Sequence, residues 1–461
     1  MIFLRFDSGT ITLSSGQDAF LPGEIADCFT FDPRSSLWRA PAHFYARTVL
    51  ALRCTKTAFT DEARDYLPLE TLALREKITP YPHQQTALQE WTRSGCRGIV
   101  SLPTGSGKTI LAILAIAQLK RPTLVLVPTI DLLVQWTKVL EKFLNHPVSM
   151  LGGGSHQVGE ITVSTYDSAV LNIEFIGSRF ALLIADECHH LPAPETRLCA
   201  AMSIAPFRLG LSATPELDEE RQQIMTDLLG EIVCDTAIDE LEGKILANYQ
   251  VKKLHVGLTP EESAAYKSNR EIYTGFLRSH RINFNMPDAW QRFLWSCARF
   301  PGGKEALKAF FTQRQIARAG SEKLLAVKNI LLAHTGERVL IFTADNHTAY
   351  HIGRTFTLPV LTHHTKAAER KEFLELFKSG QYPVLVTSKV LNEGVDVPEA
   401  SVGIVVSGSG SVREHVQRLG RILRPAAGKP VAVLYELVSV NTSEESISQR
   451  RREHRAYRRR Y

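Results

Sequence analysis

This chain of 461 residues lacks paired cysteines, long apolar runs and a secretory signal. Its seven cysteines are scattered and contain no C-x-x-C pair, which suits a reducing compartment and argues against a zinc ribbon or an iron–sulfur cluster. No run of about 18 apolar residues occurs, and the start MIFLRFDSG soon meets an acidic residue, so neither a membrane span nor a secretory signal is indicated. We therefore expect an intracellular protein with no membrane partner.

An excess of charge of one sign is missing from most of the chain. The formal net charge is +6, but the last twelve residues, RRREHRAYRRRY, hold seven arginines and one glutamate, so residues 1–449 are balanced. A polyanionic partner is compatible with this distribution, although a modest net charge does not decide a function. The arginine-rich end, residues 441–461, is expected to bind DNA, to dock on a partner or to be a solvated helix end.

The chain also lacks internal repeats and low-complexity linkers, yet it is longer than one hydrophobic core usually organises. From about residue 80, short apolar runs alternate with helical patterns, which predicts a parallel, doubly wound α/β sheet. These runs are at 98–102, 123–127, 161–164, 181–185 and 208–212. A second series, at 338–343, 384–388, 402–407 and 431–438, predicts a second α/β sheet. Two sheets in tandem would leave a cleft between them.

Two further segments do not fit the α/β pattern. Residues 1–75 are interpreted as a small α+β domain. Residues 259–325 are predicted to be helical, beginning with a capping box between Thr259 and Glu262. The expected division of the chain is therefore 1–75, 76–245, 246–440 with the insertion at about 259–325, and 441–461.

The stretch PTGSGKT lies between a predicted strand and an apolar helix, which is the context of a phosphate-binding loop. Its glycines would let backbone N–H groups approach phosphates, and the helix N-terminus would favour anionic oxygens. Lys108 is expected to neutralise the β- and γ-phosphates, and Thr109 to ligate Mg²⁺. The general pattern has glycine where this chain has Leu102. The predicted binding residues are Pro103, Thr104, Gly105, Ser106, Gly107, Lys108 and Thr109.

The stretch DECHH, residues 186–190, places five potential metal ligands in a row at the end of a predicted strand. Consecutive residues leaving a strand point to opposite faces, so they are not expected to converge on one transition metal. Asp186 is expected to hold Mg²⁺ through water, and Glu187 to polarise the attacking water. Cys188 is expected to be a packed residue. The sequence thus favours an ATP–Mg²⁺ site at this strand end.

Two stretches in the second series carry further candidates. QRLGRILRP contains Gln417, Arg421 and Arg424 on one helical face, the arrangement that an arginine finger aimed at a γ-phosphate requires. A solvated basic helix would show the same spacing. NEGVDVP places Gly394 and Asp396 in a strand-ending loop, where open α/β sheets bind ligands.

The motifs PTGSGKT, DECHH, GLSATP, VLVTSKVLNEGVDVP and QRLGRILRP, in this order and spacing, resemble those of superfamily 2 helicases of the DExH type over residues 80–438. The resemblance implies two tandem RecA-like lobes that couple ATP hydrolysis to movement on nucleic acid. By the same resemblance, Gln84 matches the adenine-proximal glutamine, and Thr129 and Thr165 match residues that contact the DNA backbone. His189 matches the residue that couples hydrolysis to the second lobe through Gln417.

Within that superfamily, the chain resembles the XPB family in its short archaeal and bacterial form. This rests on an N-terminal domain with FDPRSSLWRAPAHFY, on the basic and aromatic insertion, and on the arginine-rich end. The resemblance implies a domain associated with damaged DNA, a thumb that grips the duplex and 3′-to-5′ polarity. Where the family has an Arg–Glu–Asp or Arg–Asp–Asp triplet linked to strand separation, this chain has Leu217, Asp218 and Glu219.

Together these features predict an ATP-dependent DNA helicase or translocase of DNA repair, cytoplasmic and associated with the nucleoid. ATP and Mg²⁺ are the expected cofactors, duplex, forked or damaged DNA the expected partner, and a nuclease a further partner. The first alternative is a duplex translocase without strand separation, as in restriction or phage defence, and the second is an RNA helicase. A non-catalytic DNA-binding scaffold would not need the intact set Lys108, Asp186, Glu187 and Arg421.

Overall fold

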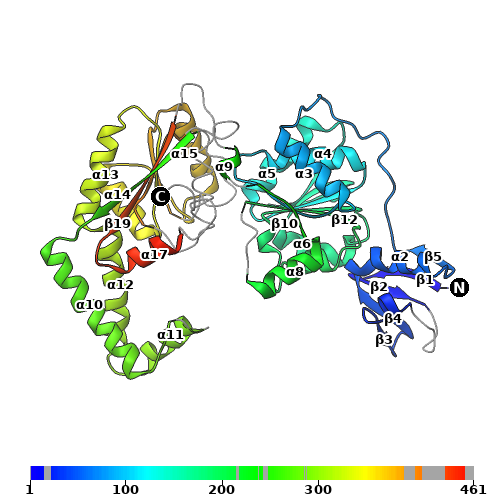
Figure 1. The fold of residues 1–461 in the computed structure, drawn as a ribbon, viewed down its shortest axis with the longest axis horizontal. Helices are drawn as coiled ribbons and strands as arrows, with labels where there is room; N and C mark the ends of the chain where they lie inside the picture. The colour runs from blue at the N-terminus through cyan, green and yellow to red at the C-terminus, as the bar shows by residue number, and fades with distance from the viewer. Residues whose placement is uncertain are drawn as a thin grey trace. The chain divides into compact units, whose positions relative to one another are not determined.

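The computed structural model describes residues 2–14, 22–213, 218–236, 238–241, 248–284, 286, 288–388, 400–407 and 431–451. The chain divides into two compact units, the first formed mainly by Met1–Glu240 and the second by the residues that follow (Figure 1). Among the described residues, no helix combines the length and apolar character needed to cross a membrane.

The first unit begins with a small α+β domain, as predicted. Its five-stranded sheet has the order β3-β4-β2-β1-β5, in which only the β1–β5 pair is parallel. The strands are β1 (Ile2–Asp7), β2 (Thr10–Leu13), β3 (Thr30–Asp32), β4 (Leu37–Pro41) and β5 (Phe59–Glu62). Helix α2 (Tyr45–Cys54) buries Ala51 and Leu52 against Leu4 and Ile11 of the sheet. We call this part the N-terminal domain.

The N-terminal domain packs directly on the rest of the first unit. Ile204 joins its hydrophobic core, and His43 Nδ1 lies 3.3 Å from the carbonyl oxygen of Ala201. Gly9 has φ +80°, and a Cβ atom there would lie 2.1 Å from Cε of Met202. The close approach of the two surfaces therefore requires glycine at this position.

The rest of the first unit, the first lobe, is built on an eight-stranded sheet with the order β13-β6-β12-β11-β7-β10-β8-β9. All its neighbouring strands are parallel except β8 and β9. The strands are β6 (Arg97–Ser101), β7 (Thr123–Val127), β8 (Val148–Gly152), β9 (Ser155–His156), β10 (Ile161–Thr165), β11 (Leu182–Asp186), β12 (Phe207–Ser212) and β13 (Ile232–Asp235). The five predicted runs coincide with β6, β7, β10, β11 and β12.

Helices cover both faces of this sheet, which explains why its central strands are continuous apolar runs. One core lies under α3 (Pro82–Arg93), α4 (Lys108–Leu119) and α5 (Ile130–Phe143). The other lies under α6 (Tyr166–Ile176), α7 (Leu198–Ala201) and α8 (Glu219–Leu229). Figure 1 shows these two helical layers above and below the strands. The doubly wound fold is thus confirmed for the first lobe.

The second lobe has a six-stranded, fully parallel sheet with the order β14-β19-β18-β15-β17-β16. Its strands are β14 (Asn248–Val256), β15 (Val339–Phe342), β16 (Val360–Leu361), β17 (Val384–Thr387), β18 (Val402–Val405) and β19 (Val431–Ser439), and its helices α13 (Ser321–Ala333), α14 (Asn346–Phe356), α15 (Ala367–Ser379) and α17 (Ser443–Arg451). The four predicted strands are present. The apolar pattern did not predict β14, because this edge strand is partly exposed and contains lysines.

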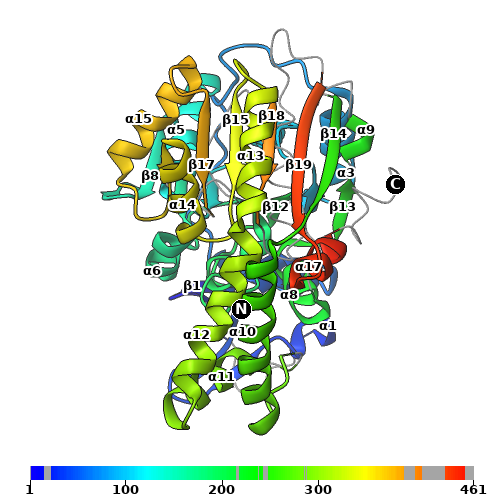
Figure 2. The same ribbon diagram turned by 90° about the vertical axis from the view of Figure 1, so that its left-hand side faces the viewer.

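The predicted helical insertion is a hairpin of α10 (Pro260–Ser279) and α12 (Gly303–Ala319) with α11 (Ala289–Arg299) at its far end (Figure 2). The capping box at its start is confirmed: Thr259 Oγ1 accepts from the N–H of Glu262, and Glu262 Oε2 accepts from the N–H of Thr259, each at 3.2 Å. Its aromatic residues divide between two roles. Phe293 is fully buried in the hairpin core, whereas Trp295 is 57% exposed.

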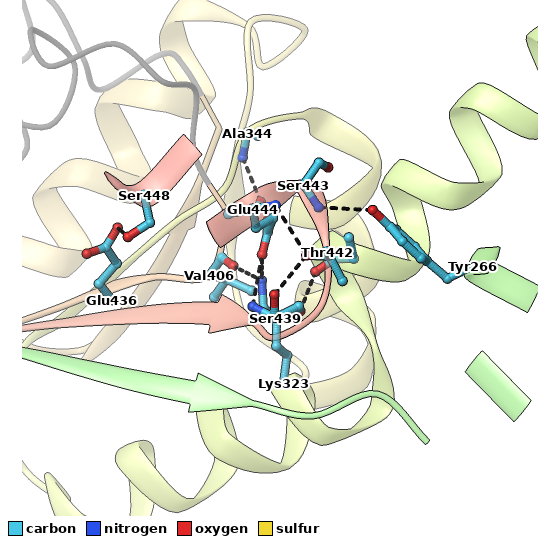
Figure 3. Close-up of polar contacts among 12 residues, drawn as sticks. Tyr266, Lys323, Ala344, Val406, Glu436, Ser439, Thr442, Ser443, Glu444 and Ser448 are labelled. Atoms are coloured by element: carbon cyan, nitrogen blue, oxygen red, sulfur yellow. Dashed lines mark hydrogen bonds and ion pairs between the residues drawn. The ribbon is translucent and has the colours of Figure 1, made fainter. Parts of the chain in front are cut away.

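A buried ion pair joins the main parts of the second lobe (Figure 3). Lys323 Nζ on α13 contacts the carboxylate of Glu444 on α17 and donates to the carbonyl oxygen of Val406, just after β18, at 2.7 Å. The residue before Glu444 is tied to the hairpin, because the N–H of Ser443 donates to the Tyr266 hydroxyl at 2.9 Å. The pair neutralises two charges that would each be costly to bury alone.

Removing one partner of this ion pair is expected to destabilise the second lobe. Lys323→Met leaves the carboxylate of Glu444 buried without a cation and should lower the free energy of unfolding by about 3–5 kcal/mol. Adding Glu444→Gln should restore at least half of the loss, because the neutral amide still accepts from the N–H of Ser439. Urea denaturation followed by circular dichroism measures both effects, with Lys328→Met on the exposed face of α13 as control. Equal loss in the single and double variants would contradict the pairing.

The contact between His43 and the first lobe is expected to weaken in acid. Burial, reinforced by the charge of Arg208, lowers the pKa of His43 from 6.5 to about 4. The folded protein therefore resists protonation that the unfolded chain accepts, so stability present above pH 6.5 is lost as the pH falls towards 4. At pH 5 the loss should be about 2 kcal/mol. Unfolding free energies at pH 7.5 and 5.0 should differ less for His43→Gln than for the natural chain, and an identical difference would refute this origin.

Candidate active site

The predicted site residues of the first lobe gather at one edge of its sheet. The phosphate-binding loop follows β6, Thr129 follows β7, Thr165 ends β10, Asp186 ends β11 and Ser212 ends β12. These strands run parallel, so their carboxyl ends meet on the same side although the residues are far apart in sequence.

The loop before α4 has the backbone that its glycines predict. Gly105 and Gly107 both have φ +87°, a left-handed conformation that other residues adopt at a cost. A Cβ atom on Gly107 would lie 2.2 Å from Nε2 of Gln84. Ser106 is buried, and its Oγ donates to the carbonyl oxygen of Pro103 at 2.7 Å. The loop is thus held by its own contacts, and helix α4 begins at Lys108.

Lys108 places a nearly buried positive charge beside the acidic pair. Its Nζ lies 3.7 Å from Oε1 of Glu187, and the two side chains are only 11% and 13% exposed. The ammonium has no hydrogen-bond partner among the described residues, and neither has Oγ1 of Thr104. A buried ammonium without acceptors is costly, so this environment fits an anionic ligand such as a phosphate. Thr109 follows at the second position of α4, half-buried.

Asp186 is fixed by three contacts and kept away from water. Its Oδ2 accepts from Nε1 of Trp136 at 2.8 Å, its Oδ1 accepts from the N–H of Glu187 at 3.0 Å, and its carbonyl oxygen accepts from the Tyr166 hydroxyl at 3.0 Å. Burial, together with the charge of Glu187, raises the pKa of Asp186 to about 6, against the opposing effect of Lys108. A carboxylate whose charge is destabilised in this way fits a site for a divalent cation.

The turn after β11 connects the acidic pair to β12. Glu187 has φ +47°, an uncommon conformation for a residue with a side chain. Its Oε2 lies 3.5 Å from Nδ1 of His189, which in turn lies 3.3 Å from Oγ of Ser212. Cys188 is fully buried, as expected for a packed residue, and the ring of His190 lies 4.3 Å from that of His189. In the part of the chain that the structure describes, no three acidic, histidine or cysteine side chains form a metal-ligating group.

Gln84 is bound to the phosphate loop itself. It is 2% exposed, and its Nε2 lies 3.0 Å from the carbonyl oxygen of Ser106 and 3.2 Å from that of Gly107. Its Oε1 accepts from the N–H of Tyr81 at 2.9 Å, and Nε2 of His83 lies 2.8 Å from the Ser106 carbonyl. The start of α3 thus braces the loop. The contact with adenine stays a prediction.

The two threonines expected to contact DNA both cap helices. Thr129 Oγ1 accepts from the N–H of Leu132 at 3.3 Å, and Thr165 Oγ1 accepts from the N–H of Ser168 at 3.2 Å. Thr165 is only 6% exposed. Each therefore stands at a helix N-terminus, a position that suits phosphate binding, and contact with DNA stays a prediction.

Part of the predicted site lies outside the described residues, namely Gly394, Asp396, Gln417, Arg421 and Arg424, together with Leu217 of the altered triplet. Three residues that sequence analysis did not single out belong to the described site: His83, Trp136 and Tyr166. Trp136 had a detectable signal, because a buried indole on an amphipathic helix needs an acceptor for its N–H group.

Three family models match the chain. They are the "Xeroderma pigmentosum group B helicase damage recognition domain" over residues 4–63, the "Type III restriction enzyme, res subunit" over residues 77–217, and the "ERCC3/RAD25/XPB C-terminal helicase" over residues 309–456. Among solved structures, the Hef helicase domain of Pyrococcus furiosus has a TM-score of 0.55 at 18% identity, covering 79% of this chain and 98% of that one. Dbp5 of S. cerevisiae, bound to RNA and ADP BeF3, has a TM-score of 0.58 at 15% identity over 83% and 89% of the two chains. These likenesses confirm the fold of two RecA-like lobes.

One curated relative matches nearly the whole chain, and another matches three quarters of it. It is 38% identical over 454 residues to the DNA 3′-5′ translocase XPB2 of Sulfurisphaera tokodaii, covering 98% of this chain and 100% of the relative. It is 29% identical over 358 residues to the DNA 3′-5′ helicase XPB of Mycobacterium tuberculosis, covering 75% of this chain and 58% of that protein. The full-length match, the two XPB family models and the site geometry confirm the resemblance found in the sequence: the chain belongs to the XPB family of DNA helicases and translocases.

Proposed function

We propose that this chain hydrolyses ATP to move along DNA with 3′-to-5′ polarity. The observation that carries the proposal is the buried ammonium of Lys108 beside Asp186 and Glu187, in a chain related along its whole length to a DNA 3′-5′ translocase. Family membership implies ATP use. We further propose that Mg²⁺ is the cation bound with ATP and that the protein acts in DNA repair.

The residues of the first lobe divide the chemistry among them. Lys108 and the loop backbone would hold phosphate oxygens. Thr109, and Asp186 through water, would hold Mg²⁺, which would stabilise charge on those oxygens during hydrolysis. Trp136 keeps the Asp186 carboxylate oriented. Glu187 orients the attacking water and accepts its proton.

The remaining predicted residues complete the cycle. His189 lies between the carboxylate of Glu187 and Ser212, the first residue of the SATP motif. We infer that it couples hydrolysis at Glu187 to this motif. Arg421 and Arg424 supply positive charge to the γ-phosphate from the second lobe, and Gln417 is the partner of His189 in that lobe. Gly394 and Asp396 lie beside the nucleotide. Backbone contacts at Thr129 and Thr165 hold DNA while the lobes open and close.

The proposal also covers strand separation and partners. Leu217 in place of the family arginine favours translocation on duplex DNA over unwinding. DNA is the nucleic acid, and a nuclease partner would act on the DNA that the motor delivers. We propose a separate task for each part of the chain. Residues 1–75 recognise DNA, 76–245 and 246–440 form the two helicase lobes with a thumb at about 259–325, and 441–461 form the arginine-rich end.

Loss of either charged partner in the first lobe is expected to abolish turnover. Lys108→Ala should remove ATP binding, because the phosphate charge loses its counter-ion. Glu187→Gln should retain ATP binding but lower kcat at least 100-fold, because the amide does not accept a proton. Coupled ATPase assays and nucleotide-binding titrations distinguish the two effects. The controls are Lys138→Ala and Glu141→Gln on α5, and hydrolysis that survives both site variants would sink the assignment.

The nucleic-acid substrate is tested by comparing ATPase rates with no nucleic acid, single-stranded DNA, duplex DNA and RNA. We expect stimulation by DNA and much less by RNA, since translocation couples hydrolysis to the correct strand. Triplex displacement on a duplex should report movement, while release of a strand from a forked duplex should be weak because Leu217 replaces the arginine. Equal stimulation by RNA would favour an RNA helicase, and efficient unwinding would contradict the reading of Leu217.

A further inference from the structure

A cavity of about 900 Å³ lies between the N-terminal domain and the first lobe. The N-terminal domain contributes α2 residues such as Leu50 and Arg53, and the connection after β5 contributes Arg64 to Pro68. The first lobe contributes the starts of its strands, among them Arg97 and Phe207. None of these residues belongs to the ATP site.

The cavity lies at the edge of the sheet opposite to that site. Arg97 and Phe207 are the first residues of β6 and β12, and Ala181 comes directly before β11. The loop with Lys108 follows the other end of β6, and Asp186 is the other end of β11. A strand of five residues spans roughly 15 Å, so a ligand in the cavity leaves the catalytic edge open.

The charge of the cavity lining is strongly positive. Four arginines line it, against the single carboxylate of Asp65. Arg64 is paired with Asp61 at 3.7 Å, and Arg97 donates to the carbonyl oxygen of Asp227 at 2.6 Å. The other two are Arg53 and Arg121, whose guanidinium groups make no hydrogen bond or ion pair within the described residues. These two cations are available to an anionic occupant.

The apolar part of the lining identifies the kind of anion. Leu50 and Leu67 are 61% and 77% exposed, whereas the Tyr45 ring is only 6% exposed and its hydroxyl donates to Asp61. Stacking of nucleotide bases needs open aromatic faces, whereas Tyr45 is buried and the other aromatic residues of the lining, Tyr66 and Phe207, are only partly exposed. Exposed leucines next to arginines instead match aliphatic side chains flanked by carboxylates.

The shape favours an extended occupant. A second cavity of about 260 Å³ shares Asp65, Tyr66 and Leu67 with the first and adds Arg179 and Glu160 to its lining. The segment 65–67 is thus flanked by hollows on two sides. A chain of several residues fills such a groove better than one compact ligand does.

We call the two adjoining cavities on either side of residues 65–67 the groove. We propose that this groove is a docking site for an acidic peptide segment of a protein partner. The segment places aliphatic side chains against Leu50 and Leu67 and carboxylates against Arg53 and Arg121. Because the groove lies at the amino edge of the sheet, the partner stays bound while ATP and DNA are handled at the other edge. The interaction is independent of the proposed function, since it uses no residue of the ATP site.

The groove is tested with the full-length protein and a random twelve-residue peptide library displayed on phage. Selection should enrich peptides that combine Asp or Glu with Leu, Ile or Val. A fluorescein-labelled copy of an enriched peptide should bind at least tenfold more weakly to Arg53→Glu/Arg121→Glu and to Leu67→Ser. The matched control Arg47→Glu/Arg197→Glu, at exposed arginines outside the groove, should bind like the natural chain. Unchanged thermal unfolding and basal ATPase activity show that the variants are folded.

Two results would overturn the proposal. One is enrichment of peptides without acidic residues, or of peptides that bind the groove variants as tightly as the natural chain. The other is a change of ligand class: a twenty-nucleotide oligothymidylate that loses affinity tenfold in Arg53→Glu/Arg121→Glu, while peptide binding is unaffected, identifies a single-stranded DNA site instead.

Discussion

The parallel alignment of the strands in the first lobe is the constraint on which its chemistry depends. Because β6, β11 and β12 run in the same direction, the loop with Lys108, the acidic pair and Ser212 arrive at one edge from positions more than 100 residues apart. The predicted site residues of the first lobe that the structure describes all lie at that edge, and the N-terminal domain packs near the opposite edge. One sheet thus presents two surfaces with different chemistry, the proposed nucleotide site at the carboxyl ends and an arginine-lined groove at the amino ends.

The buried cations of this protein differ in their hydrogen-bond and ion-pair partners. This difference distinguishes cations that stabilise the fold from one that is proposed to bind a ligand. Lys323 is neutralised by Glu444 and donates to a backbone carbonyl, and Arg208 is fully buried while donating to four backbone carbonyl oxygens. Both are structural. Lys108 is nearly as buried but faces Glu187 at 3.7 Å without a hydrogen bond, an environment that becomes favourable when an anion enters. The Asp186 carboxyl is comparable, because burial and the charge of Glu187 raise its pKa to about 6 and a nearby cation would favour its charged form.

Three parts of the second lobe, the helical insertion, the sheet and the C-terminal helix, are held together by a few polar contacts. The insertion, the end of β18 and the C-terminal helix meet at the contacts of Lys323, Ser443 and Tyr266 (Figure 3). Residues 408–430, which hold the predicted arginine fingers, follow directly after that end of β18 in the sequence.

Local pattern alone was sufficient for much of this protein. The glycines and lysine of PTGSGKT, the apolar strands and the capping box at Thr259 depend on neighbouring residues, and each agrees with the structure. The family resemblance depends on the order and spacing of five short motifs, and the relatives confirm it. Contacts between distant segments had to come from the tertiary structure. Trp136 reaches Asp186 across 50 positions, and Gln84 reaches the phosphate loop across 22. The arginine-lined groove forms only where the N-terminal domain packs on the first lobe. A short stretch of sequence does not determine which strand ends lie at the same edge of a sheet, because that depends on the order of the strands in the folded chain.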